Sequence, residues 1–188
     1  EAGFFADLGI DCEVISSTGT SQAMSGLLAT TTQYTRFQSI SALITVANED
    51  APFVAFGTPV QRSAFEMQSM AEKPIRDIRD LEGKAVGVVS AGGTTDQIID
   101  LMAVRAGIDP KSIQRKVTGL GTSAYTFAEK GDIAAWTGSA AERQALEASG
   151  KKIHSWNFDD VMLVPADSYI TTRDEIEKHR DVVVKVLA

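Results

Sequence analysis

The stretch Lys84–Gly107, KAVGVVSAGGTTDQIIDLMAVRAG, carries the pattern that decides the fold. It opens on a short apolar run rich in β-branched residues, Lys84–Ser90, which predicts an inner strand buried on both faces of a sheet. A Gly/Thr turn follows, and Asp96–Arg105 has apolar residues close to helical spacing, which predicts a helix ending at Gly107. This order leaves backbone N–H groups at the helix start, where the positive end of the helix dipole lies. We therefore predict that the turn forms half of a ligand site.

An ordinary strand-to-helix turn has the same composition, because Thr or Asp caps a helix and Gly permits positive φ. On this stretch alone the purely structural interpretation is favoured. The turn is not a P-loop, since no Gly-Lys-Ser/Thr follows, and it lacks the third spaced glycine of a dinucleotide-binding fingerprint.

Composition places the chain among globular proteins of one good-sized domain or two small lobes. It has 188 residues, of which 44% are hydrophobic and 23% charged. A formal net charge of −7 argues against nucleic acid and against an anionic membrane surface, because both need clustered Lys and Arg. Cys12 is the single cysteine, which excludes an intrachain disulfide, and its neighbours predict a small buried residue in a strand over Cys12–Ile15.

The same strand, turn and helix order occurs elsewhere in the chain. Ser16–Ser21 follows the predicted strand Cys12–Ile15 and precedes a predicted helix over Gln22–Ala29. Gly119–Ser123 is a third Gly/hydroxyl turn, and it precedes a predicted helix over Ala124–Lys130. Repetition of one arrangement raises the weight of the ligand-site interpretation.

Strands alternate with helices along most of the chain, which predicts an α/β class with largely parallel sheets. The charged connector Glu72–Gly83 divides the chain into two lobes, 1–83 plus 168–188 and 84–167. Other helices are predicted over 1–8, 39–47 and 140–149, and a last predicted helix is capped by Thr172. Other strands are predicted over 52–56, 64–70, 113–117, 132–136, 152–156, 161–164 and 168–171. The alternation in 64–70 predicts one exposed strand face, and Thr30–Phe37 shows neither period.

Several short motifs in this order resemble type II periplasmic solute-binding proteins of ABC importers. The group most similar to this chain binds alkanesulfonates, nitrate and thiamine-pyrimidine precursors. The matching segments are Phe4–Val14, Leu81–Val88, Ala91–Thr95, Ala106–Pro110, Gly131–Trp136 and Tyr169–Thr172. The resemblance implies that the chain is a piece of such a protein, because members begin with a further strand and run on past residue 188.

The resemblance also implies a two-lobed fold with a two-strand hinge, helices on both faces of each sheet and a ligand in the cleft between the lobes. It implies an extracytoplasmic monomer, periplasmic or lipid-anchored, that delivers a sulfonate, pyrimidine or small carboxylate to a membrane permease. The implied ligand-binding residues are Ser17, Thr18, Gly19, Thr58, Pro59, Gly92, Gly93, Thr94, Thr95, Trp136 and Thr137. Ligands of open α/β sheets bind at the carboxyl ends of strands, which agrees with these positions.

Catalytic patterns are weak in this sequence. His154 and His179 have no ligand at metal spacing, and no serine lies in a Gly-x-Ser-x-Gly elbow, so we expect no metal, no cofactor and no catalysis. Arg62 is the cation nearest the predicted turns. Two alternatives stay open: an enzyme similar to pyrimidine-precursor synthases on the same scaffold, and the ligand-sensing domain of a regulator.

Overall fold

The chain forms two compact units in the computed structural model, which describes residues 3–163 and 166–187. Unit 1 comprises residues 1–60 and 165–188, and unit 2 comprises residues 61–164. This division differs from the predicted lobes, because residues 61–83 belong to unit 2 and residues 165–167 to unit 1. The cause is β3 (Phe65–Met70), which pairs on both sides with strands of that unit.

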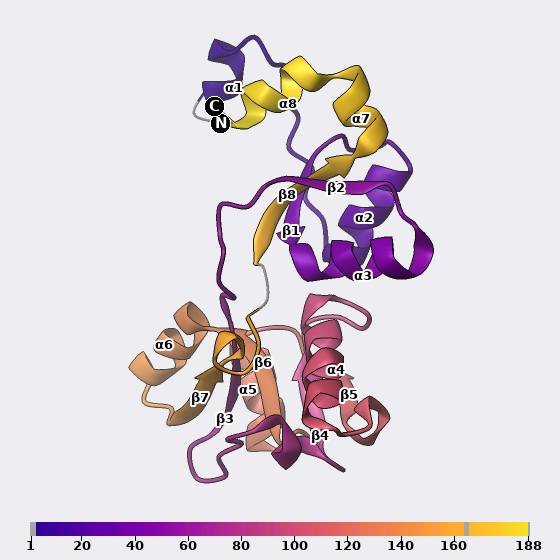
Figure 1. Ribbon diagram of the computed structural model, residues 1–188. Coiled ribbons are helices and arrows are strands. Elements are labelled where there is room, and N and C mark those ends of the chain that lie inside the picture. Colours follow the sequence, from indigo (N-terminus) through magenta and orange to yellow (C-terminus); the bar gives the residue numbers. More distant parts are fainter. Residues whose placement is uncertain (1–2, 164–165, 188) are drawn as a thin grey trace. The chain divides into compact units, whose positions relative to one another are not determined.

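Unit 1 contains a three-stranded sheet in the order β1-β8-β2, with both pairings antiparallel. Helices α2 and α3 lie beside this sheet (Figure 1). Their apolar faces and the sheet bury a core that includes Leu27, Phe37, Phe53 and Ile170. The elements of unit 1 are α1 (Phe4–Asp7), α2 (Thr20–Leu28), β1 (Thr35–Gln38), α3 (Ser39–Glu49), β2 (Phe53–Gly57), β8 (Asp167–Thr172), α7 (Arg173–Lys178) and α8 (Arg180–Leu187).

The last predicted helix of the chain is divided in two. The Thr172 hydroxyl accepts the backbone N–H of Glu175 at 3.2 Å and caps α7, as the sequence predicts. His179 then leaves the helical conformation, with φ −132° and ψ 39°, and α8 begins at the next residue.

Unit 2 contains a five-stranded mixed sheet in the order β5-β4-β6-β3-β7. β4 pairs parallel with β5 and β6, whereas β3 pairs antiparallel with β6 and β7. The elements of unit 2 are β3, η1 (Ile78–Leu81), β4 (Ala85–Val88), α4 (Thr94–Ala106), η2 (Pro110–Ser112), β5 (Gln114–Val117), α5 (Thr122–Glu129), β6 (Ala135–Ser139), α6 (Ala140–Ala148), β7 (Ile153–Asn157) and η3 (Phe158–Asp160).

β4 is the inner strand that the sequence predicts, and its composition explains its place. Val86 and Val88 are fully buried. Between them, Gly87 permits close packing, because a Cβ there would lie 2.7 Å from Thr118 Oγ1 and 2.9 Å from Ile133 Cδ1. Gly107 ends α4 with φ 75°, a left-handed conformation that glycine adopts without strain.

The α/β class is confirmed, and several finer predictions are wrong. Neither sheet is parallel-rich, since antiparallel pairing joins every neighbouring pair of strands described except those of β4. β3 has no exposed face, because strands flank it on both sides and helices cover it. β6 begins at Ala135, three residues later than predicted. The sequence did not reveal β1.

Two predicted strands are absent from the described residues. Cys12–Ile15 pairs with no strand, and Cys12 and Val14 are exposed, so the expected burial of Cys12 is also wrong. An apolar alternation cannot form a strand without a neighbouring backbone to pair with. Val161–Leu163 is likewise unpaired, and Val164 lies outside the described residues, as do Glu1 and Ala2 of the first predicted helix.

Candidate functional site

Three helices of unit 2 begin at one edge of its sheet. The strands β4, β5 and β6 run parallel, and α4, α5 and α6 follow their carboxyl ends. The connections are Val89–Gly93, Thr118–Gly121 and a direct passage from Ser139 into α6. Backbone N–H groups and the positive ends of helix dipoles therefore gather at this edge, which we call the carboxyl edge of unit 2.

The turn before α4 brings four predicted residues together, namely Gly92, Gly93, Thr94 and Thr95. Gly92 has φ 65°, and its N–H donates to Asp96 Oδ2 at 2.8 Å. A Cβ on Gly93 would lie 2.3 Å from Ser90 Oγ, so a larger residue there would displace the Ser90 hydroxyl. Thr94 and Thr95 are buried, and Thr95 Oγ1 accepts the N–H of Val89 at 3.4 Å. The turn is compact, and its own hydrogen bonds hold its shape.

A carboxylate already lies beside the start of α4. Asp96 accepts the Gly92 N–H through one oxygen, and Arg115 Nε donates to the other oxygen at 3.0 Å. A negative charge in the first turn neutralises part of the positive potential of the helix terminus. This arrangement disfavours a ligand that depends on a full negative charge at α4.

Trp136 and Thr137 lie inside β6 and not at its end, which corrects their predicted ligand contact. Both side chains are fully buried. Trp136 Nε1 donates to Gln68 Oε1 at 3.0 Å, and Tyr125 contacts the indole edge-to-face with ring centroids 6.1 Å apart. Thr137 Oγ1 donates to the Gly87 carbonyl at 3.4 Å. The structure assigns both residues to the core of unit 2, because the strand starts three residues later than the sequence pattern indicated.

A partly buried ion pair that the sequence did not predict lies near the start of α6. Arg143 Nε donates to Glu66 Oε2 at 2.9 Å, and Arg143 Nη1 donates to Glu147 at 3.0 Å. The hydrogen bond with Glu66 raises the pKa of Arg143 above its ordinary value. Gln68 connects this pair to the indole of Trp136, since its Nε2 donates to the Ser139 carbonyl at 2.9 Å and lies 3.5 Å from Glu66. The alternation of charged, amide and apolar residues in β3 is the sequence pattern that could have indicated buried polar contacts on this strand.

Unit 1 also has a polar strand edge, formed by hydroxyl groups. β8 is antiparallel to β1 and β2, so its first residues lie beside the carboxyl ends of both strands. Thr58 Oγ1 lies 2.8 Å from Ser168 Oγ, and Ser168 Oγ lies 2.5 Å from Ser39 Oγ. Thr58 and the neighbouring Pro59 are exposed, as a ligand contact requires. The sequence predicted Thr58 and Pro59 but missed Ser39 and Ser168.

The buried amide of Gln38 lies next to this hydroxyl group cluster in the sequence. Gln38 is 6% exposed, and its Oε1 has no hydrogen-bond partner. Buried polar atoms are nearly always paired, and an unpaired one often marks a place where a ligand or water binds.

The predicted turn Ser17–Gly19 precedes α2 in unit 1. Thr18 donates to Gln22 Oε1 from its backbone N–H at 2.7 Å and from its hydroxyl at 2.9 Å. Ser17 and Thr18 are exposed.

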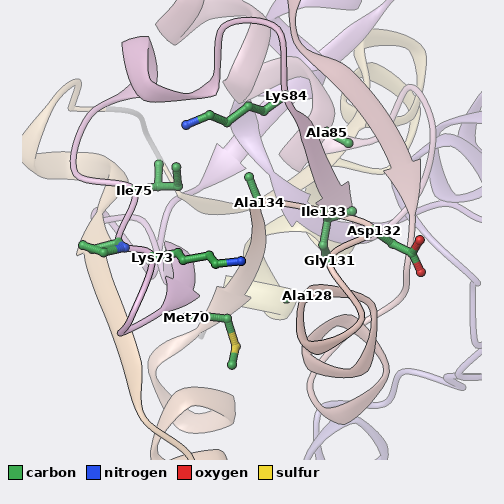
Figure 2. A pocket seen from close by; sticks show the side chains of 11 residues that line it. Met70, Lys73, Ile75, Lys84, Ala85, Ala128, Gly131, Asp132, Ile133 and Ala134 are labelled. Carbon is green, nitrogen blue, oxygen red and sulfur yellow. The ribbon is translucent and has the colours of Figure 1, made fainter.

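A cavity lies elsewhere, at the opposite edge of the unit 2 sheet (Figure 2). It has a volume of about 590 Å³ and contains none of the predicted ligand residues. No group of three or more His, Cys, Asp or Glu side chains in residues 3–163 and 166–187 is placed to hold a metal ion. In the same residues, no helix is both long and apolar enough to cross a membrane.

The model of the family described as "NMT1/THI5 like" matches residues 1–188. The chain belongs to this family. A search of curated proteins gave no match.

Solved structures similar to this member of the NMT1/THI5-like family share its fold at low sequence identity. A protein from Bordetella bronchiseptica RB50 superposes with a TM-score of 0.80 at 17% identity, over 98% of this chain and 61% of that one. The periplasmic aliphatic sulphonate binding protein SsuA of Escherichia coli superposes with a TM-score of 0.71 at 18% identity, over 92% of this chain and 58% of that one. The alkanesulfonate-binding protein SsuA of Xanthomonas axonopodis pv. citri, solved with MOPS bound, superposes with a TM-score of 0.71 at 16% identity, over 92% of this chain and 58% of that one.

This family member therefore has the periplasmic-binding-protein fold, which confirms the fold that the sequence resemblance implies. The chain spans about three fifths of the length of the solved structures that it matches.

Proposed function

We propose that this protein is the solute-binding component of an ABC importer, which captures a small polar organic molecule or anion without catalysis. It would act outside the cytoplasm and deliver the solute to a membrane permease. The observation that carries the proposal is the carboxyl edge of unit 2, where three helices begin side by side in a chain of this family.

The chemistry of this edge suits a polar ligand. Gly92 is exposed at the turn before α4, and Gly119 and Gly121 stand before α5 with positive φ. Backbone N–H groups at such turns bind oxygen atoms of a ligand without a side-chain cation. Arg115 and Arg143 already pair with carboxylates, so neither cation is free to hold an anionic group. This favours a ligand bound by hydrogen bonds, such as a pyrimidine or the oxygens of a sulfonate or small carboxylate.

The hydroxyl cluster of unit 1 supports the proposal independently. Thr58 is exposed, and its hydroxyl is held by Ser168, so its position is fixed before a ligand arrives. Gln38 contributes a buried carbonyl oxygen that has no partner. A fixed hydroxyl and an unsatisfied acceptor recognise N–H and O–H groups of a ligand.

Titration calorimetry against sulfonates, pyrimidines and small carboxylates tests the proposal. We expect one of these classes to bind with 1:1 stoichiometry. Thr58→Val should weaken binding about tenfold, as the loss of one buried hydrogen bond does. Thr126→Val is the matched control, because this hydroxyl donates only to the Thr122 carbonyl within α5.

Two outcomes would contradict the proposal. One is the absence of heat with all three classes at millimolar ligand. The other is equal affinity of Thr58→Val, Thr126→Val and the unmodified protein for the ligand that binds. Steady turnover of that ligand would instead indicate an enzyme.

A further inference from the structure

The cavity of about 590 Å³ in unit 2 lies at the edge where β4 and β6 begin and β3 ends. The carboxyl edge, with the three helix starts, is at the other ends of the same strands. Ligand pockets have volumes of about 300 to 1,000 Å³, so this cavity is large enough for a small organic molecule. Figure 2 shows its lining, which comprises Met70, Lys73, Pro74, Ile75, Lys84, Ala85, Ala128, Gly131, Asp132, Ile133 and Ala134.

The wall of the cavity is apolar and is part of the core of unit 2. Ala128 and Ile133 are buried members of the cluster that contains Trp136, and Met70 and Ala85 pack against that cluster. Side chains fixed by a core cannot move to fill a neighbouring hollow. The apolar surface is therefore already formed before any ligand binds.

Hydrogen bonds also hold the loop that closes one side. The backbone N–H of Ile75 donates to Ser69 Oγ at 3.0 Å, and the indole of Trp156 donates to the Ile75 carbonyl at 2.9 Å. The N–H of Lys73 donates to the Met70 carbonyl at 3.0 Å. A preorganised loop lowers the entropic cost of binding. The hydrogen bond to Ile75 also places Trp156 beside the cavity, where a bound ligand would change the fluorescence of the indole.

The charged side chains at the cavity leave it positive. Neither Lys73 nor Lys84 forms an ion pair with the residues that the structure describes. Asp132 Oδ1 lies 3.9 Å from Lys116 Nζ. Figure 2 shows the Asp132 carboxylate directed away from the amino groups of Lys73 and Lys84. Asp80 is not among the lining residues; it interacts electrostatically with Lys84, and its carboxylate accepts the backbone N–H groups of Arg76 and Asp77.

We propose that this cavity is a second binding site, which takes a small amphipathic organic anion. The anionic head would lie between Lys73 and Lys84, and the hydrocarbon part would lie against Ile75, Ala128 and Ile133. Lysine amino groups at the mouth and apolar side chains at the wall match the two ends of such a ligand. The site is distinct from the polar edges of the proposed function, and it stands even if that function is wrong.

Octanoate and octanamide are the matched probes, because they share the hydrocarbon part and only octanoate is charged. The chain has two tryptophans, and Trp136 and Trp156 both lie next to the cavity wall, so intrinsic fluorescence reports binding. We expect octanoate to change the emission and to bind about fivefold more tightly than octanamide. Equal affinity, or no change at about 10 mM octanoate, would overturn the proposal.

Variants separate this site from non-specific binding. The double variant Lys73→Gln/Lys84→Gln should abolish the preference for octanoate, whereas Lys178→Gln in α7 should leave it unchanged. Ala134→Leu keeps both charges but fills the cavity, and it should weaken both probes about tenfold. Circular dichroism and thermal unfolding show which variants are folded. Octanoate affinity that is unchanged in folded Lys73→Gln/Lys84→Gln and in folded Ala134→Leu contradicts the assignment.

Discussion

Replacing Trp136 with phenylalanine should destabilise unit 2, because the indole is a core side chain with a specific hydrogen bond. The ring is fully buried, and its Nε1 donates to Gln68 Oε1 at 3.0 Å. Phenylalanine keeps an aromatic ring beside Tyr125 but removes the donor. The Gln68 carbonyl oxygen then stays buried without a partner.

The expected loss has two parts. A buried acceptor left without its partner costs about 1–3 kcal/mol. The smaller ring leaves a cavity of about 40 Å³, which adds about 1 kcal/mol at about 24 cal/mol per Å³. We therefore expect Trp136→Phe to lower the free energy of unfolding by about 2–4 kcal/mol. Trp156→Phe is the matched control and should cost less, because Trp156 is only partly buried and water can reach the Ile75 carbonyl.

Urea unfolding followed by far-ultraviolet circular dichroism measures both variants. The variants Trp136→Phe and Trp156→Phe also test the burial of each indole directly, since each variant retains a single tryptophan. In Trp156→Phe the remaining Trp136 should emit at short wavelength and resist quenching by acrylamide. Quenching as efficient as that of free tryptophan, or an unfolding free energy of Trp136→Phe equal to that of the unmodified protein, would refute the assignment of Trp136 to the core.

Three further perturbations test the packing and charges of unit 2. Gly138→Ala should cost about 1–3 kcal/mol of stability in thermal unfolding, because its Cβ would lie 2.9–3.0 Å from the Gln68 amide. Arg143→Gln should cost about 1–3 kcal/mol by urea unfolding, since it leaves the Glu66 carboxylate, 8% exposed, without its cation; an unchanged unfolding free energy would contradict this. Asp77 caps η1 and Asp80 completes the capping box, and the backbone N–H groups of Arg76 and Asp77 lower the pKa of Asp80 below its ordinary value of 3.8. Asp80→Asn should therefore lower the stability at neutral pH, and the difference from the unmodified protein should vanish as pH falls through the lowered pKa; a difference that persists in acid would contradict it.

Local sequence patterns located most elements of this protein. The β-branched run before Gly92 predicted β4 as an inner strand, and glycine and helical spacing predicted α4 with its end at Gly107. Such patterns succeed because strand and helix formation depend first on near neighbours in the chain. Gly92, Gly93, Thr94 and Thr95 form one turn before α4 because they are consecutive in the sequence.

Pairing and burial depended on contacts between distant residues. Whether Val14 lies in a strand depends on a neighbouring backbone, and the described residues supply none. The role of Trp136 depended on a shift of three residues in the start of β6, which moved the indole from a strand end to the core beside Gln68. No local pattern contains that information, because β3 and β6 are far apart in sequence and meet only in the sheet.

By itself, the sequence determined the α/β class, the helix-starting turns and the family, since each is written in short runs of neighbouring residues. Only the tertiary structure decided that Thr58 joins Ser168 and Ser39, that Glu66 pairs with Arg143, and that two unpaired lysines stand at an apolar cavity. These groups come together through strand order and side-chain packing, which a one-dimensional pattern does not specify.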